Sequence, residues 1–363
     1  MFEKAVEFIK NCRGKTVIIY DTDGDGIGAA VIVAKTLKRL FGKYPKAIPA
    51  YHDMFNATME SSYKKLSEGK DNIIIVDIAA DAHPEYMLKL AKKHKILIID
   101  HHQVKRNLNR VKNIVHVNSS FWKSKIKPSQ YAASKMTFDI CKKIADIEDM
   151  DWVAGLGIIN DCSGPAWKDF LNKIYKKYPY LKGKNLYTFD NKLGYINNLI
   201  TSGYFHSGIG AIKLGYKIYM KSESPMDVIK LKTEPAKKLK KMYDEIEEEM
   251  KCVMKNWKGE AEIFKNKNLI ILELKTKFAI KSPISTKISM KNRNCTLVVA
   301  RKSKDKMHVS FRRQDGKVDC GELARKSIKD LKNANGGGHA PAAAAVIMAK
   351  DWKKLKENII RLL

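Results

Sequence analysis

Residues 16–28 read TVIIYDTDGDGIG. The first five are mostly β-branched and glycines follow, which predicts a buried strand that ends at residue 20 and leads into a turn. Asp21, Asp23 and Asp25 then stand at alternate positions. Carboxylates crowded at one strand end repel one another, and a bound divalent cation removes that repulsion. The segment therefore predicts a cation site at the end of the first strand.

Two other interpretations fit part of this segment. An Asp/Gly turn that holds no ligand is the simplest alternative. A dinucleotide-binding loop is disfavoured, because the third glycine of Gly24, Gly26 and Gly28 is not at the position that the G-x-G-x-x-G motif requires. Acids also stand where a pyrophosphate would lie.

The composition limits the class of protein. A length of 363 residues allows two domains, each with its own core. The net charge of +30 favours a polyanionic partner, most simply nucleic acid, although a generally lysine-rich surface would give the same charge. The six cysteines form no CxxC pair, which disfavours a zinc ribbon or a disulfide framework. Without a long apolar run or an apolar leader, we expect a cytoplasmic protein and no membrane partner.

The first half of the chain alternates short apolar strands with helices, which predicts an α/β domain with a parallel, doubly wound sheet. The expected strands after the first are 72–77, 96–100 and 114–117, and the expected helices are 29–41, 129–145 and one from 151. Such sheets bind ligands at the carboxyl ends of their strands. Three strands end in aspartate, at Asp21, Asp77 and Asp100, so we expect these acids along one edge.

The second half predicts a smaller α/β domain, joined to the first by a long helix. Apolar positions at helical spacing predict that helix over 234–257, after a shorter one over 209–220. Four strands are then expected at 260–264, 269–274, 295–301 and 307–311, followed by a helix over 320–331. The predicted domains are residues 1–225, a helical connector 226–257, and residues 258–363.

Two further segments carry candidate ligands. Asp100-His101-His102 follows an apolar strand, where one histidine could bind metal and the other could face a substrate phosphate. Asn160-Asp161 follows an apolar stretch and completes the set. Each has a simpler alternative: a helix cap for Asp77, a surface loop for the histidines, and a helix-terminal turn for Asp161.

Together these positions supply six oxygen or nitrogen ligands, which fit a site for two divalent metals: Asp21, Asp23, Asp25, Asp77, His101 and Asp161. The histidine favours Mn²⁺, with Mg²⁺ as the alternative. A two-metal site of this kind hydrolyses phosphoesters by attack of an activated water.

These segments, in this order, resemble the motifs of the DHH phosphoesterase superfamily, named for the triplet Asp100-His101-His102. Gly336-Gly337-Gly338-His339 and the strand Val309-Ser310-Phe311-Arg312 resemble the DHH-associated substrate-binding domain. The resemblance covers most of the chain and is closest to the compact RecJ-like exonucleases of archaea. One position departs from the pattern: the family's first motif often begins with histidine, where this chain has Asp21.

The resemblance implies that the six positions above are Mn²⁺ ligands. It also implies that His102 is a phosphate contact or a catalytic group, and we place Asp25 and Asp100 with it in the catalytic set. In the second domain it implies substrate-phosphate contacts by Arg312, Gly336, Gly337, Gly338 and His339. The glycines could also present backbone N–H groups to a phosphate without any family context, whereas a glycine turn packed on Ala342–Ala345 is the alternative.

The expected function is a metal-dependent exonuclease that releases mononucleotides from single-stranded DNA or RNA. The aromatic residues Tyr175, Tyr178 and Tyr180, interleaved with lysines, are candidates for base stacking, or else they belong to a helix core. A phosphodiesterase for short oligonucleotides or cyclic dinucleotides is the alternative enzyme. A non-catalytic replication or repair scaffold is the alternative of another class, and replication or repair proteins are candidate partners.

Overall fold

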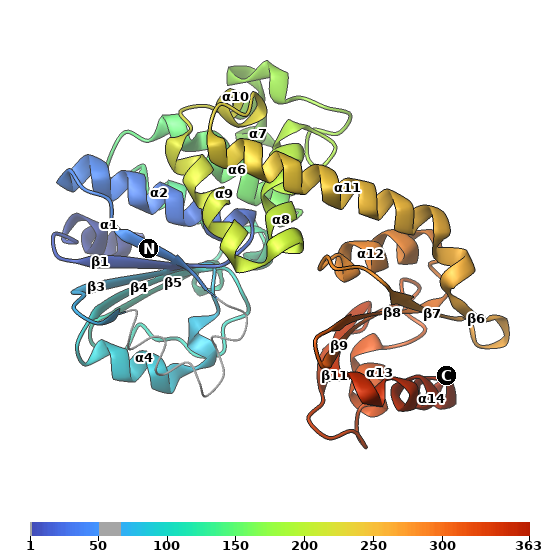
Figure 1. The fold of residues 1–363 in the computed structure, drawn as a ribbon. Helices are drawn as coiled ribbons and strands as arrows, with labels where there is room; N and C mark the ends of the chain where they lie inside the picture. Colours follow the sequence, from blue (N-terminus) through green and yellow to red (C-terminus); the bar gives the residue numbers. More distant parts are fainter. Residues whose placement is uncertain (1, 51–66) are drawn as a thin grey trace. The chain divides into compact units, whose positions relative to one another are not determined.

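The computed structural model describes residues 2–50 and 67–363. It divides into two compact units, Met1–Tyr243 and Asp244–Leu363, each with its own sheet (Figure 1). Both units are α/β, and the first contains a fully parallel sheet, as the sequence predicts. The division falls inside the long helix α11, Glu234–Glu260.

The sheet of the first unit has the strand order β2-β1-β3-β4-β5. The strands are β1 (Thr16–Tyr20), β2 (Lys46–Pro49), β3 (Asn72–Val76), β4 (Lys95–Asp100) and β5 (Ile114–Asn118). Four of them are predicted strands, with ends shifted by one residue at most. Strand β2 was not predicted, because it is short, partly exposed and ends in proline, and so it lacks the apolar run that marks the buried strands.

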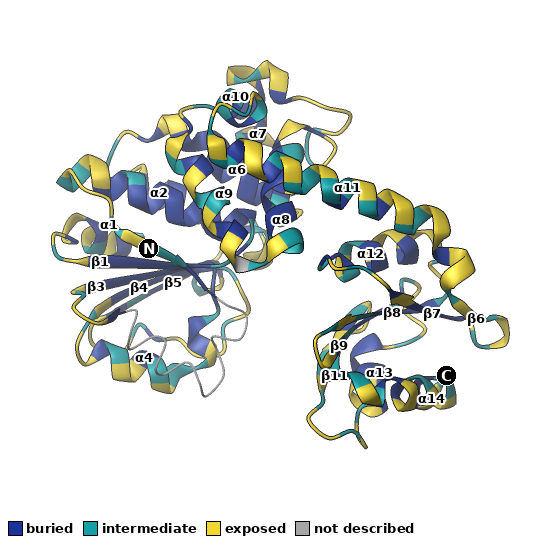
Figure 2. Ribbon diagram, in the orientation of Figure 1, coloured by how far each residue is buried: buried dark blue, intermediate teal, exposed yellow. Residues whose placement is uncertain are grey.

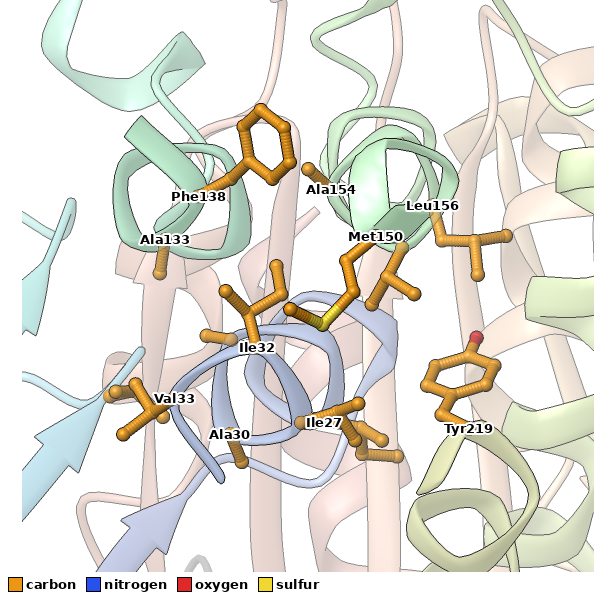
Figure 3. Packing of buried hydrophobic residues seen from close by; sticks show 14 of the residues in the cluster. Ile27, Ala30, Ile32, Val33, Ala133, Phe138, Met150, Ala154, Leu156 and Tyr219 are labelled. Atoms are coloured by element: carbon orange, nitrogen blue, oxygen red, sulfur yellow. The ribbon is translucent and has the colours of Figure 1, made fainter. Parts of the chain in front are cut away.

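Helices cover both faces of this sheet, which makes it doubly wound. Alternate residues of β1 point to opposite faces: Ile18 joins the larger core cluster, and Val17 joins the smaller one. The larger cluster includes residues of α2 (Gly24–Phe41), α5 (Ala133–Cys141), α6 (Asp151–Asn160) and α9 (Ile209–Lys221). Helices α5, α6 and α9 pack around α2 (Figure 3). The smaller cluster includes Met87 of α4 (Pro84–Ala91). Other α-helices in the described part of this unit include α1 (Glu3–Lys10), α7 (Lys168–Lys177), α8 (Lys192–Ser207) and α10 (Pro225–Ile229).

Helix α2 begins earlier than expected, and this changes the aspartate segment. The predicted turn extends to residue 28, but the helix starts at Gly24, with Asp23 as its N-cap. Asp25 therefore lies in the first helical turn and not in a loop. Helix α5 is shorter than the predicted 129–145 at both ends, because a separate 3-10 turn, Pro128–Gln130, precedes it and a turn follows Cys141.

The second unit contains a mixed sheet of six strands in the order β10-β11-β9-β8-β7-β6. The strands are β6 (Glu262–Phe264), β7 (Leu269–Leu274), β8 (Thr296–Ser303), β9 (Lys306–Arg312), β10 (Asn335–His339) and β11 (Ala342–Met348). The core cluster on one face includes residues of α13 (Cys320–Ser327) and α14 (Trp352–Leu362), and α12 (Lys281–Lys291) contacts β8 and β9. Strands β7, β8 and β9 are mostly buried, whereas the edge strands β6 and β10 are largely exposed. The helices expose their outer sides (Figure 2). The glycine-rich segment is an edge strand, β10, which pairs with β11, and not the glycine turn of the alternative interpretation.

None of the helices in the described part of the chain has the length and apolar character that crossing a membrane requires.

Candidate metal centre

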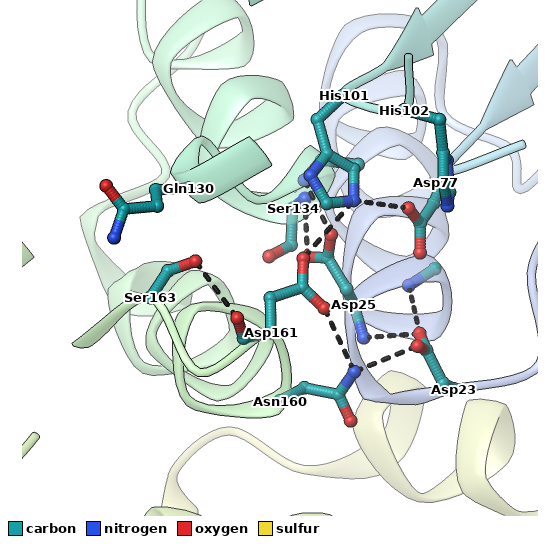
Figure 4. A network of polar contacts seen from close by, with 12 residues as sticks. Asp23, Asp25, Asp77, His101, His102, Gln130, Ser134, Asn160, Asp161 and Ser163 are labelled. Atoms are coloured by element: carbon teal, nitrogen blue, oxygen red, sulfur yellow. Dashed lines mark hydrogen bonds and ion pairs between the residues drawn. The ribbon is translucent and has the colours of Figure 1, made fainter. Parts of the chain in front are cut away.

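The predicted ligands come together at the carboxyl edge of the parallel sheet. Asp23 follows β1, Asp77 follows β3 and His101 follows β4, while Asp161 comes from the end of α6 (Figure 4). Because parallel strands all point the same way, residues that follow their last positions gather at one edge.

Asp25 is fully buried and is held by the start of α5. The backbone N–H groups of Ala133 and Ser134 donate to its two carboxylate oxygens at 2.6 and 2.9 Å. The free N–H groups and the dipole at a helix N-terminus favour a negative charge there. This support fixes the position of the carboxylate. It could not be predicted from the sequence, because Ala133 contributes only its backbone.

Asp23 caps α2 by accepting hydrogen bonds from the backbone N–H groups of Asp25 and Gly26 at 2.9 and 3.1 Å. Its second oxygen accepts a hydrogen bond of 2.9 Å from the Asn160 amide. The same amide lies 3.2 Å from Asp161 Oδ1 and so ties two predicted ligands together. Asn160 is thus a positioning residue, which the sequence indicated only as the neighbour of Asp161.

Asp77 adopts a left-handed backbone conformation, with φ of 59°. This region is unfavourable for most residues, and aspartate and asparagine tolerate it best. The turn directly after β3 keeps the Asp77 carboxylate buried, with 3% of the residue exposed. Strain of this kind is common at functional sites.

His101 lies between two of the carboxylates. Its Nε2 is 3.3 Å from Asp77 Oδ1 and 3.3 Å from Asp161 Oδ2. In the described part of the chain, these two oxygens and His101 Nδ1 are nevertheless buried without a geometrically satisfactory hydrogen bond. Buried polar atoms normally have partners, so several unsatisfied atoms at one point fit a site that binds a cation.

The potential ligand atoms form three overlapping groups, and the atoms within each group lie within 4.8 Å of one another. The groups are Asp21 with Asp23 and Asp77, Asp25 with His101 and Asp161, and Asp77 with His101 and His102. Carboxylate oxygens and imidazole nitrogens are donors suited to Mn²⁺ or Mg²⁺. The donor set therefore fits divalent cations, and Asp77 and His101 each belong to two of the groups.

Burial and mutual repulsion raise the pKa values of three carboxyl groups. Burial raises the pKa of Asp161 to about 10, with the nearby charges of Asp25 and Asp23 adding to the effect. Burial and the Asp25 charge raise the pKa of Asp77 well above its ordinary value, and burial raises that of Asp25. Without a cation these three carboxyl groups keep their protons to a higher pH than ordinary carboxyl groups do. A metal ion binds their ionised forms, so metal binding at this site releases protons.

Asp100 and His102 form a separate pair beside the ligands. His102 Nδ1 lies 2.7 Å from the buried Asp100 carboxylate, whose charge makes this nitrogen the donor. The hydrogen bond to Asp100 raises the pKa of His102. Burial alone would raise the pKa of Asp100, but its contacts with His102 lower it. The side chain of His102 is 47% exposed, so its Nε2 remains available to a substrate.

A close approach between helices completes the centre. A Cβ atom at Gly157 of α6 would lie 2.1 Å from Asp25 Oδ1 and 2.0 Å from Ser134 Oγ. Only glycine therefore lets α6 pass this close to the buried carboxylate. Gly157 was not predicted as part of the site, although a glycine inside an apolar helix is a recognisable sign of tight packing.

Comparison with known families agrees with this geometry. The model described as "DHH family, N-terminal domain" matches residues 15–158, and the model described as "DHHA1 domain" matches residues 266–363. The chain belongs to the DHH family. Its DHH match ends shortly before Asp161, and its DHHA1 match covers most of the second unit. No curated protein sequence matches the chain.

Solved structures share the fold of this DHH chain at low sequence identity. RecJ from Thermus thermophilus in complex with Mn²⁺ is similar with a TM-score of 0.74 and 13% identity, over 99% of this chain and 54% of that one. The chain thus spans about half the length of that protein. An exonuclease RecJ bound to manganese has a TM-score of 0.71 and 13% identity, over 99% and 93% of the two chains. CDC45 from Entamoeba histolytica has a TM-score of 0.65 and 10% identity, over 99% and 98%.

In the DHHA1 unit, the strand register places two predicted phosphate contacts on one face. Arg312 of β9 pairs with Ala342 of β11, which in turn pairs with His339 of β10, so the three side chains share a face. That face is opposite to the one that packs on α13 and α14, because Phe311 and Ala343 join their core. Gly336, Gly337 and Gly338 lie in the same edge strand.

Cationic and polar groups beside Arg312 were not predicted from the sequence. The Arg312 guanidinium lies 3.3 Å from Ser282 Oγ in the first turn of α12. Burial, together with the charges of Arg312 and Arg301, lowers the pKa of the neighbouring Lys281 to about 8. Cations held this close to one another favour an anion.

One predicted contact is wrong. Tyr175 is 1% exposed, and its hydroxyl donates to the Leu186 carbonyl at 2.5 Å, so its ring is part of the core and cannot stack on a base. Tyr178 is half-buried and Tyr180 is 37% exposed, with ring centroids 6.0 Å apart. Base stacking by these two remains a prediction.

Proposed function

We propose that this DHH chain is a metal-dependent phosphodiesterase that removes mononucleotides from an end of single-stranded DNA or RNA. The observation that carries the proposal is the buried cluster of unsatisfied ligand atoms around His101, which lies 3.3 Å from both Asp77 and Asp161. The likeness to RecJ, one structure of which is described as an exonuclease bound to manganese, supports the choice of reaction.

Two ligand sets would hold divalent cations. Asp21, Asp23 and Asp77 form one set and Asp25, His101 and Asp161 form the other, with Asp77 near both. Bound Mn²⁺ or Mg²⁺ would supply an activated water and neutralise charge on the phosphate. Asp21 stays in this set even though the family often has histidine there, because its carboxylate groups with those of Asp23 and Asp77.

The chain's own side chains provide positioning and charge. Asp100 holds His102 through Nδ1 and leaves Nε2 facing outward, where a protonated imidazole can donate to a phosphate oxygen. Ala133, Ser134 and Asn160 fix the carboxylates by hydrogen bonds and so limit movement of the ligands. In the second unit, Arg312, His339 and the glycine strand would bind a substrate phosphate, with Lys281 adding charge below about pH 8.

The test is cleavage of a 5′-labelled and an internally labelled 20-mer, each as DNA and as RNA, with Mn²⁺ or with EDTA. We expect release of mononucleotides with Mn²⁺ and no cleavage with EDTA. Comparison of the products from the two labels reveals which end of the strand is attacked. Asp77→Asn keeps a residue that tolerates the left-handed backbone but removes a charged ligand, so turnover should fall at least 100-fold. Asp330→Asn, at an exposed position, should have no effect.

Rates on 2-mers and 20-mers separate the related functions. Faster cleavage of 2-mers or cyclic dinucleotides would indicate a short-oligonucleotide phosphodiesterase. Binding of a strand without cleavage under any metal would contradict the proposal and favour a non-catalytic scaffold, the alternative that the retained ligand set disfavours.

A further inference from the structure

The edge of the parallel sheet opposite to the metal centre carries a lysine at every strand. Lys46 and Lys95 are the first residues of β2 and β4, Lys15 directly precedes β1, and Lys70 and Lys112 precede β3 and β5 by two residues. Neighbouring strands are about 4.8 Å apart, so the five lysines lie along an edge of roughly 19 Å. Within the described part of the chain, none of their ammonium groups forms an ion pair with a carboxylate.

A pocket of about 190 Å³ opens at one end of this lysine edge. Four lysines, Lys15, Lys43, Lys46 and Lys70, contribute to its lining together with Tyr44, and no carboxylate residue does. Asp71, which follows Lys70, accepts a hydrogen bond of 2.7 Å at its Oδ2 from the Lys15 backbone N–H, so its charge offsets part of that of the lysines, but it does not line the pocket. The pocket thus concentrates positive charge without an internal counter-ion.

Tyr44 gives the pocket an exposed aromatic surface. It is 52% exposed, the most of any aromatic side chain in the described residues, and the Lys38 ammonium lies 5.6 Å from its ring centroid. A flat ring bordered by cations is the combination with which proteins bind single-stranded nucleic acid, since a base stacks on the ring and the cations follow the phosphates.

Helix ends explain part of this charge, but not the whole of it. Helix α2 ends at Phe41 near the pocket, and Lys38 donates to the Gly42 carbonyl, so this lysine satisfies the negative end of a helix. The strand-end lysines make no such bond to a helix carbonyl in the described residues. Helix capping therefore leaves a row of ammonium groups available.

We propose that this lysine edge and the Tyr44 pocket form a second binding surface for single-stranded nucleic acid, on the side of the first unit away from the metal centre. A strand of sufficient length would contact it through three or more phosphates and one stacked base. The surface lies within the first unit and needs no metal. The inference therefore does not depend on the proposed hydrolysis.

Binding of a labelled 30-mer in EDTA, measured by fluorescence anisotropy, tests the proposal. The variant Lys15→Gln/Lys46→Gln/Lys70→Gln should weaken binding at least tenfold and reduce the slope of log K against log salt by about 2, since each lost phosphate contact removes about 0.7. The matched control, Lys350→Gln/Lys353→Gln/Lys354→Gln, removes the same charge from exposed positions of the second unit and should weaken binding less than threefold.

Tyr44→Ala provides an independent variant, because an exposed side chain contributes little to folding. It should weaken 30-mer binding three- to tenfold, and a bromodeoxyuridine-containing 30-mer should crosslink to Tyr44 on irradiation. Equal weakening of 30-mer binding in the two triple variants would overturn the proposal. Unchanged 30-mer binding both in the triple variant that includes Lys15→Gln and in Tyr44→Ala would also overturn it. Loss of binding to phosphatidylserine vesicles, with 30-mer binding intact, would also overturn it and assign the edge to a membrane surface.

Discussion

The carboxyl group of Asp161 opposes folding of the metal-free protein as the pH rises. In an unfolded chain it ionises near pH 4, whereas burial and the Asp25 and Asp23 charges raise its pKa to about 10 in the folded state. Between these values the folded state binds more protons than the unfolded state, so stability falls as the pH rises. A cation reverses this effect by stabilising the ionised form.

We therefore predict that Asp161→Asn raises the melting temperature in EDTA, by at least about 3 °C at pH 8 and by less at pH 5. Wild type should gain stability from Mn²⁺, more at pH 8 than at pH 5, and the variant should gain much less. Differential scanning fluorimetry measures both effects. Asp330→Asn is the control, and an equal Mn²⁺ gain in Asp161→Asn would contradict the ligand assignment.

The Asp100–His102 pair makes a prediction about the pH dependence of turnover. The hydrogen bond to Asp100 raises the pKa of His102, so a protonated imidazole persists to higher pH than it would alone. If the protonated form assists the reaction, Asp100→Asn should move the alkaline limb of kcat to lower pH, and His102→Ala should lower kcat by about 10²–10⁴-fold and remove that limb. Metal-induced stabilisation should persist in both variants. An unchanged pH profile in Asp100→Asn would show that His102 does not act as this acid.

Helix α6 shows how packing of an element controls the centre. A methyl group at Gly157 would overlap Asp25 and Ser134, so Gly157→Ala must move α6 or displace the carboxylate. We predict a loss of stability of about 1–3 kcal/mol from overpacking, together with a loss of Mn²⁺-induced stabilisation. Chemical denaturation with and without Mn²⁺ measures both. The matched control is Gly259→Ala in α11, where a Cβ meets no atom within 4 Å and alanine should be neutral or stabilising.

Some features of the strands and helices could be predicted from the sequence, and others could not. Apolar strands that end in acids could be placed at one sheet edge from parallel-sheet geometry alone, and Asp77 and His101 lie there. Tyr175 was misread because Leu171, Ile174 and Tyr175 repeat at helical spacing, a core pattern that the interleaved lysines obscure. The supports from Ala133 and Ser134 use backbone atoms of a distant helix, for which side-chain chemistry gives no signal.

At the scale of the whole molecule, the net charge of +30 is large enough to dominate association with a strand. The sequence predicts this charge, but not its distribution, because only the sheet topology brings Lys15, Lys46 and Lys95 to one edge of the first unit. The acids of the metal centre occupy the other edge of the same sheet. Charge neutralisation by phosphates should therefore account for most of the binding energy.

We predict that raising the salt concentration from 50 to 200 mM weakens 30-mer binding on the order of 100-fold, the loss expected for about five phosphate contacts to a single strand. Anisotropy titrations in EDTA measure the effect without cleavage. A methylphosphonate 30-mer of the same sequence, which keeps the bases but lacks backbone charge, should bind weakly and with little dependence on salt. If the neutral strand bound as tightly as the natural one, base stacking and not charge would hold the substrate, and the excess of lysine would have another cause.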